Sequence, residues 1–281
     1  MSLPNYFPFM HGVYDVKAGI TALGKDQGNG PLDAQVFQID EQFDVYLDVK
    51  LEARRWPDRH ILRKGLDRDT EKAIAMWMLH RLSKEHPTRH PKIDEINKLA
   101  GVARLVQEDF AVLQLDGQGN NHLTYLHVCM PSGWPPEEKI GKPFHEVHAP
   151  VPHIEPINAK QDSIARLMVN ATRGAVRFAW TVTTDSALNH HPLRDRAAPL
   201  PTPLPDHPEG EPLLRVERQV IWGFPAHQAA LFTIRTYLYP FDSLDGPTRQ
   251  ALASAVAGMS EQSLRYKNMD REVILARLAP V

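Results

Sequence analysis

Three histidines and a glutamate fall between residues 145 and 153: His145, Glu146, His148 and His153. Two prolines fix the backbone between the last two histidines, which suits a preorganised ligand. A neutral imidazole can bind a metal ion or serve as an axial ligand of haem. His145 and His148, with a carboxylate, could also hold a mononuclear metal ion. Capping hydrogen bonds and general acid–base chemistry are the alternatives, and the residues alone leave all of these open.

The stretch 213–241 reads as two β-strands joined by a short turn at 223–226. Period-2 alternation puts three polar side chains on one face of the first strand: Arg215, Glu217 and Gln219. Arg218 falls on the opposite, mainly apolar face, and Arg235 lies on the second strand. The pattern alone favours an exposed outer face of an antiparallel sheet, on which arginine and glutamate pair. The lining of a pocket is the alternative.

The elements that must position these residues are predicted from periodicity. Apolar residues at helical spacing predict helices at 40–56, after Asp69 and at 93–106. Later stretches predict further helices at 157–170, 247–259 and near 269–278. Five strands are expected, at 110–115, 123–130 and 175–183 and in the two halves of 213–241. The fold class is therefore α+β, with an antiparallel sheet of about five strands.

We expect residues 1–106 to form a mainly helical N-terminal region packed on a core of residues 107–281, in one compact unit. The segment from Pro192 to Pro212 holds seven prolines, which predicts a long extended surface insertion.

Composition excludes several classes of protein. The net charge of −2 provides no overall basic field for binding nucleic acid. The single cysteine, Cys129, excludes a disulfide framework and a cysteine-only zinc or iron–sulfur site. Cys129 and His127 lie in an apolar strand pattern, which favours buried core residues. No apolar run is long enough for a transmembrane helix and no secretory signal is visible, so we expect no membrane partner and a cytoplasmic protein.

No dinucleotide fingerprint or phosphate-binding glycine-rich loop is present in the sequence. If the chemistry uses a flavin or a nicotinamide, we therefore expect a partner protein to carry it.

Two segments then resemble a known family. PSGWPPEEKIGKPFHEVHAPVP (131–152) resembles the signature loop of the haem-dependent oxidative N-demethylases, alpha-subunit-like. LLRVERQ (213–219) and LFTIRTYLYPF (231–241) resemble the second signature of that family. Weaker similarities at 36–50 and 264–269 extend the match over most of the chain. The residues just before Pro225 differ from the family pattern. The difference concerns the rim of the expected pocket, and therefore which amine the protein accepts.

The resemblance implies a haem b-binding, PAS-like domain: a five-stranded antiparallel sheet with helices on one side. It implies oxidation of a methylated amine such as dimethylamine with O2, releasing formaldehyde. Electrons would come from NADPH through a separate reductase carrying FMN and a 2Fe–2S centre, and a folate-binding subunit is a further expected partner.

Site roles follow from the resemblance as hypotheses. His148 is the expected proximal iron ligand, with His145 as the alternative. Glu217 suits the ammonium group of the substrate, and Arg215 or Arg218 suits negative charge developing on oxygen. Arg235 is expected to orient Glu217 or to bind a haem propionate. Trp134 and Lys139, in the signature loop, are expected around the cofactor.

Three other functions remain open at this stage. One is a haem-binding, PAS-like sensor of gas or redox state without turnover. The second is a family member that has lost haem and serves as a binding or scaffold module. The third is a non-haem iron or zinc enzyme that uses His145, Glu146 and His148.

Overall fold

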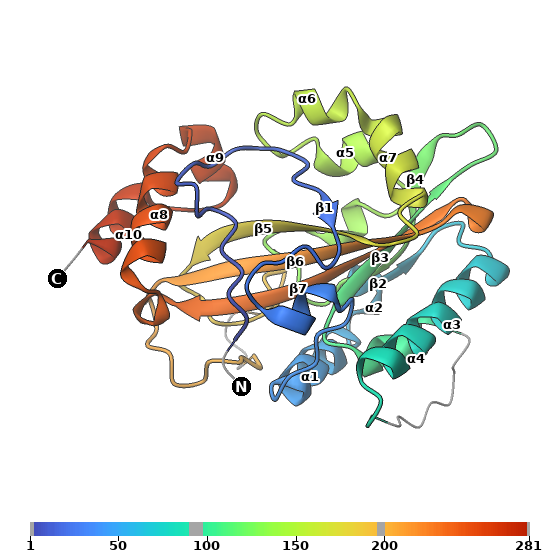
Figure 1. The fold of residues 1–281 in the computed structure, drawn as a ribbon, viewed down its shortest axis with the longest axis horizontal. Coiled ribbons are helices and arrows are strands. Elements are labelled where there is room, and N and C mark those ends of the chain that lie inside the picture. The colour runs from blue at the N-terminus through green and yellow to red at the C-terminus, as the bar shows by residue number, and fades with distance from the viewer. Residues whose placement is uncertain (1–2, 90–97, 196–199, 280–281) are drawn as a thin grey trace.

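The long hairpin predicted at 213–241 forms the centre of a seven-stranded antiparallel sheet, in a computed structural model that describes residues 3–89, 98–195 and 200–279. The sheet order is β1-β5-β6-β7-β3-β4-β2 (Figure 1). The strands span Thr21–Ala22 (β1), Ile61–Arg63 (β2), Asp109–Leu115 (β3), Asn121–His127 (β4), Ala175–Thr183 (β5), Leu213–Phe224 (β6) and Ala229–Pro240 (β7).

The helices of the described residues fall into an early, a middle and a late group. The early group is α1 (Phe43–Ala53), α2 (Pro57–His60), α3 (Arg68–Glu85) and α4 (Leu99–Val102). The middle group is α5 (Phe144–His148), α6 (Glu155–Asn158) and α7 (Gln161–Val169). The late group is α8 (Gly246–Ala257), α9 (Glu261–Tyr266) and α10 (Arg271–Leu278).

Helices lie on both sides of the sheet, with α5–α7 on one side and α1, α3 and α4 on the other (Figure 1). We call the side that bears Glu217 and Ile221 the α7 face, because Ile221 packs with Met168 and Val169 of α7. The opposite side, with Val216 and Val220, we call the α8 face. Its apolar side chains pack against α8–α10 at one end and against α3 and α4 at the other.

The sequence predicted the five long strands, β3 to β7, and they are contiguous in the sheet. The count of five was wrong, because β1 and β2 add two short edge strands of two and three residues. Strands this short cannot display a period-2 pattern. The expectation of helices on one side was also wrong, because residues 131–170 fold back over the α7 face.

Several helix boundaries differ from expectation. The stretch 40–56 contains α1, and a separate helix, α2, begins just after it at Pro57. The stretch 157–170 is split between α6 and α7. Part of the helix expected at 93–106 lies outside the described residues; the rest contains α4 and one 3-10 turn. The described parts of the proline-rich segment, 192–195 and 200–212, contain no helix or strand, as predicted.

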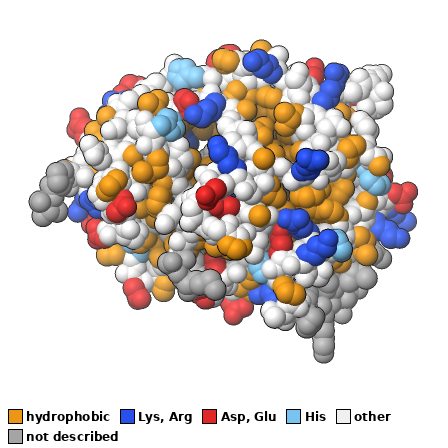
Figure 2. All heavy atoms as spheres, viewed as in Figure 1, with side chains coloured by type: hydrophobic (Ala, Val, Ile, Leu, Met, Phe, Trp, Pro, Cys, Tyr) orange, Lys and Arg blue, Asp and Glu red, His pale blue; other side chains and the backbone are white. Residues whose placement is uncertain are grey.

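None of the helices in the described ranges combines the length and apolar character needed to cross a membrane. On the face drawn in Figure 2, basic side chains lie among hydrophobic and acidic ones rather than in one basic patch. The division of the chain at residue 106 stays a prediction.

Candidate functional site

His148 ends α5, a helix of only five residues that the sequence did not predict. A helix this short is not stable alone, so other elements must fix its first N–H groups. The side chain of Asn121, at the start of β4, accepts a hydrogen bond from the backbone N–H of Phe144 at 2.6 Å. The side chain of Gln161 accepts one from His145 at 3.3 Å. Two distant elements thus hold α5, and with it the histidines, against the sheet.

The His148 imidazole is fixed in one tautomer. Its Nδ1–H donates to the carbonyl of Phe144, 2.8 Å away, and the Phe144 ring packs on the imidazole at 4.1 Å between centroids. Burial, together with the charges of Arg177 and Lys139, lowers the pKa of His148 to about 4. The ring is therefore neutral near pH 7, with its lone pair on Nε2, which has no hydrogen-bond partner among the described residues.

Glu217 lies on the α7 face in the middle of β6, opposite Ala179 of β5 and Thr236 of β7. Its carboxylate is half-buried, and the Nε2 of Gln219 donates to Oε2 at 2.9 Å. Burial lowers the pKa of Arg177, and the nearby charge of Glu217 opposes that shift. Arg177 thus lies within electrostatic reach of both His148 and Glu217.

Arg177 is opposite Gln219 in the β5–β6 register. Its Nε is buried and has no hydrogen-bond partner in the described part of the chain. The same holds for Oε1 of Gln219. Buried polar atoms without partners are uncommon in proteins and require an explanation. Here they gather beside a neutral histidine and a carboxylate, which is the arrangement expected where a ligand supplies the missing contacts.

Helix α9 approaches the same region from the edge of β5. Lys267, just after α9, donates to the carbonyl of Trp180 at 2.7 Å. Burial lowers the pKa of Lys267 to about 8, while Glu217 acts to raise it. The segment after α5 reaches α9 as well, because Nε2 of His153 lies 2.9 Å from the hydroxyl of Ser260, the N-cap residue of α9.

Other residues predicted from the signature loop lie on the same side of the sheet. Trp134 packs with Ala111 and Phe232 on the α7 face. Lys139 is buried and donates to the carbonyl of Val147 at 2.9 Å, which ties the loop to α5. His145 binds Oε1 of Gln161 through Nδ1 at 2.5 Å, and its side chain is 43% exposed.

Two of the three predicted arginines of the hairpin lie on the opposite face of the sheet from this cluster. Arg218 is on the α8 face, where it donates to the carbonyls of Asp33 and Gln35. Arg235, also on the α8 face, pairs with Asp40 at 2.7 Å. Arg215 is on the α7 face near the start of β6, where burial lowers its pKa and the charge of Glu217 opposes that shift.

The rings of Tyr46 and Tyr237 lie 3.9 and 4.7 Å from the Arg235 guanidinium. Arg215 is fully buried and donates to the carbonyls of Leu188 and Met130. The expectation of an exposed outer face was wrong, because Arg215 and Gln219 are buried. The loop and helices of residues 131–170 cover much of that face, and this fold-back is absent from the strand pattern.

Sequence reasoning missed Arg177 and Lys267. The sequence did indicate that Arg177 is unusual. Alternation along 175–183 makes Arg177 the only charged residue of the strand, on the face opposite to four apolar side chains. Nothing in the sequence pattern of Lys267 distinguished it from a surface lysine, since its burial depends on packing between α9 and β5.

The chain matches the model of the family described as haem-dependent oxidative N-demethylase, alpha subunit-like, over residues 35–273. This chain belongs to that family. The match includes β2 to β7, the α5 histidines, Arg177, Glu217 and Lys267. The family description indicates haem dependence and an oxidoreductase of the N-demethylase type, and it describes relatives that form one subunit of a larger enzyme.

The residues present fit a haem group. An axial ligand must be neutral, unprotonated at one ring nitrogen and held in orientation by the other, and His148 meets each condition. A half-buried cation with an open donor, such as Arg177, suits carboxylate or oxygen ligands. A non-haem site built from His145, Glu146 and His148 is less well matched. Within the described residues, the one group of three converging metal ligands lies elsewhere.

Proposed function

We propose that this chain binds haem b through His148 and demethylates a small secondary amine such as dimethylamine. The observation that carries the proposal is the state of His148: a neutral imidazole, held through Nδ1, whose Nε2 has no hydrogen-bond partner among the described residues. Membership of the family supports the cofactor and the class of reaction. The five contiguous long strands, β5-β6-β7-β3-β4, support a PAS-like core.

When bound, the haem would supply O2 activation and the oxidation of the N-methyl group. Dimethylamine, O2, two electrons and two protons would then give methylamine, formaldehyde and water. His148 would hold the cofactor, and its hydrogen bond to Phe144 would keep the imidazole from rotating. Trp134 and Lys139 would shape the wall on the same face of the sheet.

Glu217 would bind the substrate ammonium. Gln219 orients the carboxylate through Oε2, which leaves Oε1 for the amine. Arg177 would stabilise negative charge developing on oxygen, the role that the sequence assigned to Arg215 or Arg218. We prefer Arg177 because it lies within electrostatic reach of both His148 and Glu217, whereas Arg215 and Arg218 each donate to two backbone carbonyls, although Nε of Arg215 and Nη1 of Arg218 are also unpaired. Arg235 would stabilise the fold rather than bind a haem propionate.

Electrons would come from NADPH through a separate reductase with FMN and a 2Fe–2S centre. The description of the family as subunit-like supports such an assembly, in which a folate-binding subunit could capture formaldehyde. We propose a cytoplasmic location for it.

Absorption spectroscopy tests the proposal. The protein, purified after haem supplementation, should show a stoichiometric Soret band that shifts when dimethylamine is added. A reductase and NADPH should then yield formaldehyde in proportion to amine consumed. A Soret band that responds to gases but ignores amines would instead indicate a sensor. A protein without haem would contradict the proposal outright.

A further inference from the structure

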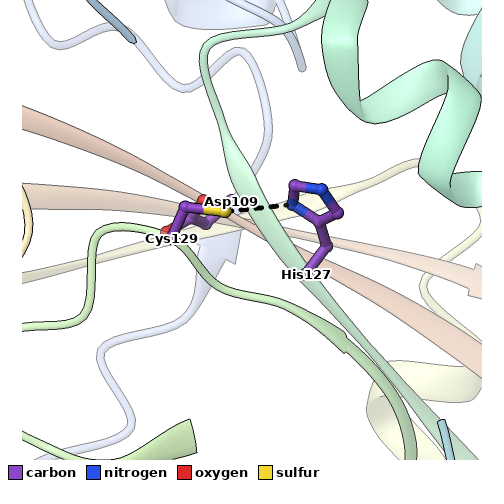
Figure 3. A group of neighbouring side chains, drawn as sticks. All are labelled: Asp109, His127 and Cys129. Atoms are coloured by element: carbon purple, nitrogen blue, oxygen red, sulfur yellow. Dashed lines mark hydrogen bonds between the residues drawn. The ribbon is translucent and has the colours of Figure 1, made fainter. Parts of the chain in front are cut away.

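A second cluster of reactive side chains lies where two strands end. Asp109 begins β3, His127 ends β4, and Cys129 follows two residues later. The three side chains converge, with one ligand atom from each lying within 4.8 Å of the others (Figure 3). All three are fully buried. None of them belongs to the haem proposal, so the cluster requires a separate explanation.

The cluster is incompletely paired. One carboxylate oxygen of Asp109 accepts from the backbone N–H of Met130 at 2.6 Å. The other, Oδ1, is buried without a partner among the described residues. Leaving such an acceptor unpaired is unfavourable, because the lost hydration of the oxygen is not replaced. The side chains of His127 and Cys129 contact each other through one long distance: Sγ of Cys129 lies 3.6 Å from Nδ1 of His127.

The spacing fits a shared metal ion. Zinc binds thiolate sulfur at about 2.3 Å and imidazole nitrogen at about 2.0 Å in tetrahedral geometry. Those bond lengths separate the sulfur and nitrogen atoms by about 3.5 Å at the tetrahedral angle. The observed 3.6 Å agrees with this value. The structure provides three of the four ligands that such an ion takes.

The charges also match a divalent cation. A thiolate and a carboxylate together offset two positive charges. Lys50 lies nearby, but carbonyls of Ala103, Val106 and Glu108 accept from its ammonium at 2.6–3.0 Å. The ligand set of one sulfur, one nitrogen and one oxygen selects zinc over magnesium or calcium.

We propose that Asp109, His127 and Cys129 form a buried structural site for Zn²⁺. The ion would join the start of β3, the end of β4 and the loop that follows. Because all three ligands are fully buried, we expect the ion to be taken up as the chain folds and to contribute stability rather than chemistry.

Elemental analysis of the haem-loaded protein, grown in zinc-supplemented medium and dialysed against a weak chelator, tests the proposal. We expect about one zinc per chain, falling about tenfold in Cys129→Ser and Asp109→Asn. His191→Gln is the matched control: His191 is equally buried but binds Glu137 at 3.0 Å, so zinc should stay. His148→Ala should lose haem and keep zinc, which separates this proposal from the proposed function.

X-ray absorption at the zinc edge keeps the test decisive if the variants fold poorly. The wild-type protein should show one sulfur scatterer at about 2.3 Å and nitrogen or oxygen at about 2.0 Å. Zinc with no sulfur ligand, or a wild-type protein with less than a tenth of an equivalent, would overturn the proposal. Zinc retained in folded Cys129→Ser would overturn it as well.

Discussion

Arg235 on the α8 face and Arg177 on the α7 face of the β5–β6–β7 ribbon use their donors differently. Arg235 is fully buried and donates to Asp40 and to backbone carbonyls. Arg177 is half-buried with Nε unpaired, within electrostatic reach of a half-buried Glu217 and a neutral His148. One unpaired nitrogen does not by itself mark a ligand site, because Nε of Arg215 and Nη1 of Arg218 are also buried without partners. What distinguishes Arg177 is that a carboxylate and a neutral imidazole both lie within its reach.

The largest expected effect concerns the histidines of α5. His148→Ala should lower haem content about tenfold or more, because it removes the free Nε2. His145→Ala is the matched control on the same short helix, and it should retain haem. Absorption measures the haem bound per chain in each variant. Equal haem loss in both variants would indicate that haem binding requires only a folded α5, and not His148 as a ligand.

The next effect separates the two faces by stability. Arg235→Met should lower the free energy of unfolding by about 3–5 kcal/mol, because Asp40 loses its buried partner. Arg177→Met should change it far less, since Nε of Arg177 has no partner to lose. Denaturant titration of the haem-free proteins measures both. Similar losses in the two variants would remove the distinction between Arg235 and Arg177.

Glu217→Gln should then reduce kcat/KM for the amine by about 10- to 100-fold, because a hydrogen bond to a charged group is worth about 1.5–3 kcal/mol. Glu146→Gln, an exposed change on α5, serves as the control. Haem content should be unchanged in both proteins. Unaltered amine kinetics in Glu217→Gln would rule out its role in binding substrate.

The smallest expected effect is on pH dependence. Burial lowers the pKa of Lys267 to about 8, so Lys267 loses its positive charge as the pH rises through 8. Its charge competes with the substrate ammonium near Glu217, and KM for the amine should therefore fall a few-fold over that range. Lys267→Met should have a low KM at every pH. A wild-type KM that stays flat from pH 7 to 9 would contradict this electrostatic coupling.

Local pattern predicted a good part of this molecule. Alternation placed Arg215, Glu217 and Gln219 on one face, and the five long strands form the centre of the sheet. Local pattern could not predict that residues 131–170 cover this face, because they return to it through contacts between residues that are distant in the sequence. The same holds for α5, whose first N–H groups depend on Asn121 and Gln161. Cys129 and His127 were expected to be ordinary core residues, and only the fold brings Asp109 to them.

The dependence of α5 on Asn121 and Gln161 has a consequence for exchange with solvent. Five residues cannot protect their own amides for long, so the backbone around His148 should open and close many times for each global unfolding event. A cofactor that binds only the closed form stabilises it by mass action. Slower deuterium uptake confined to residues 143–158 would therefore report haem binding, even in protein to which no substrate has been added.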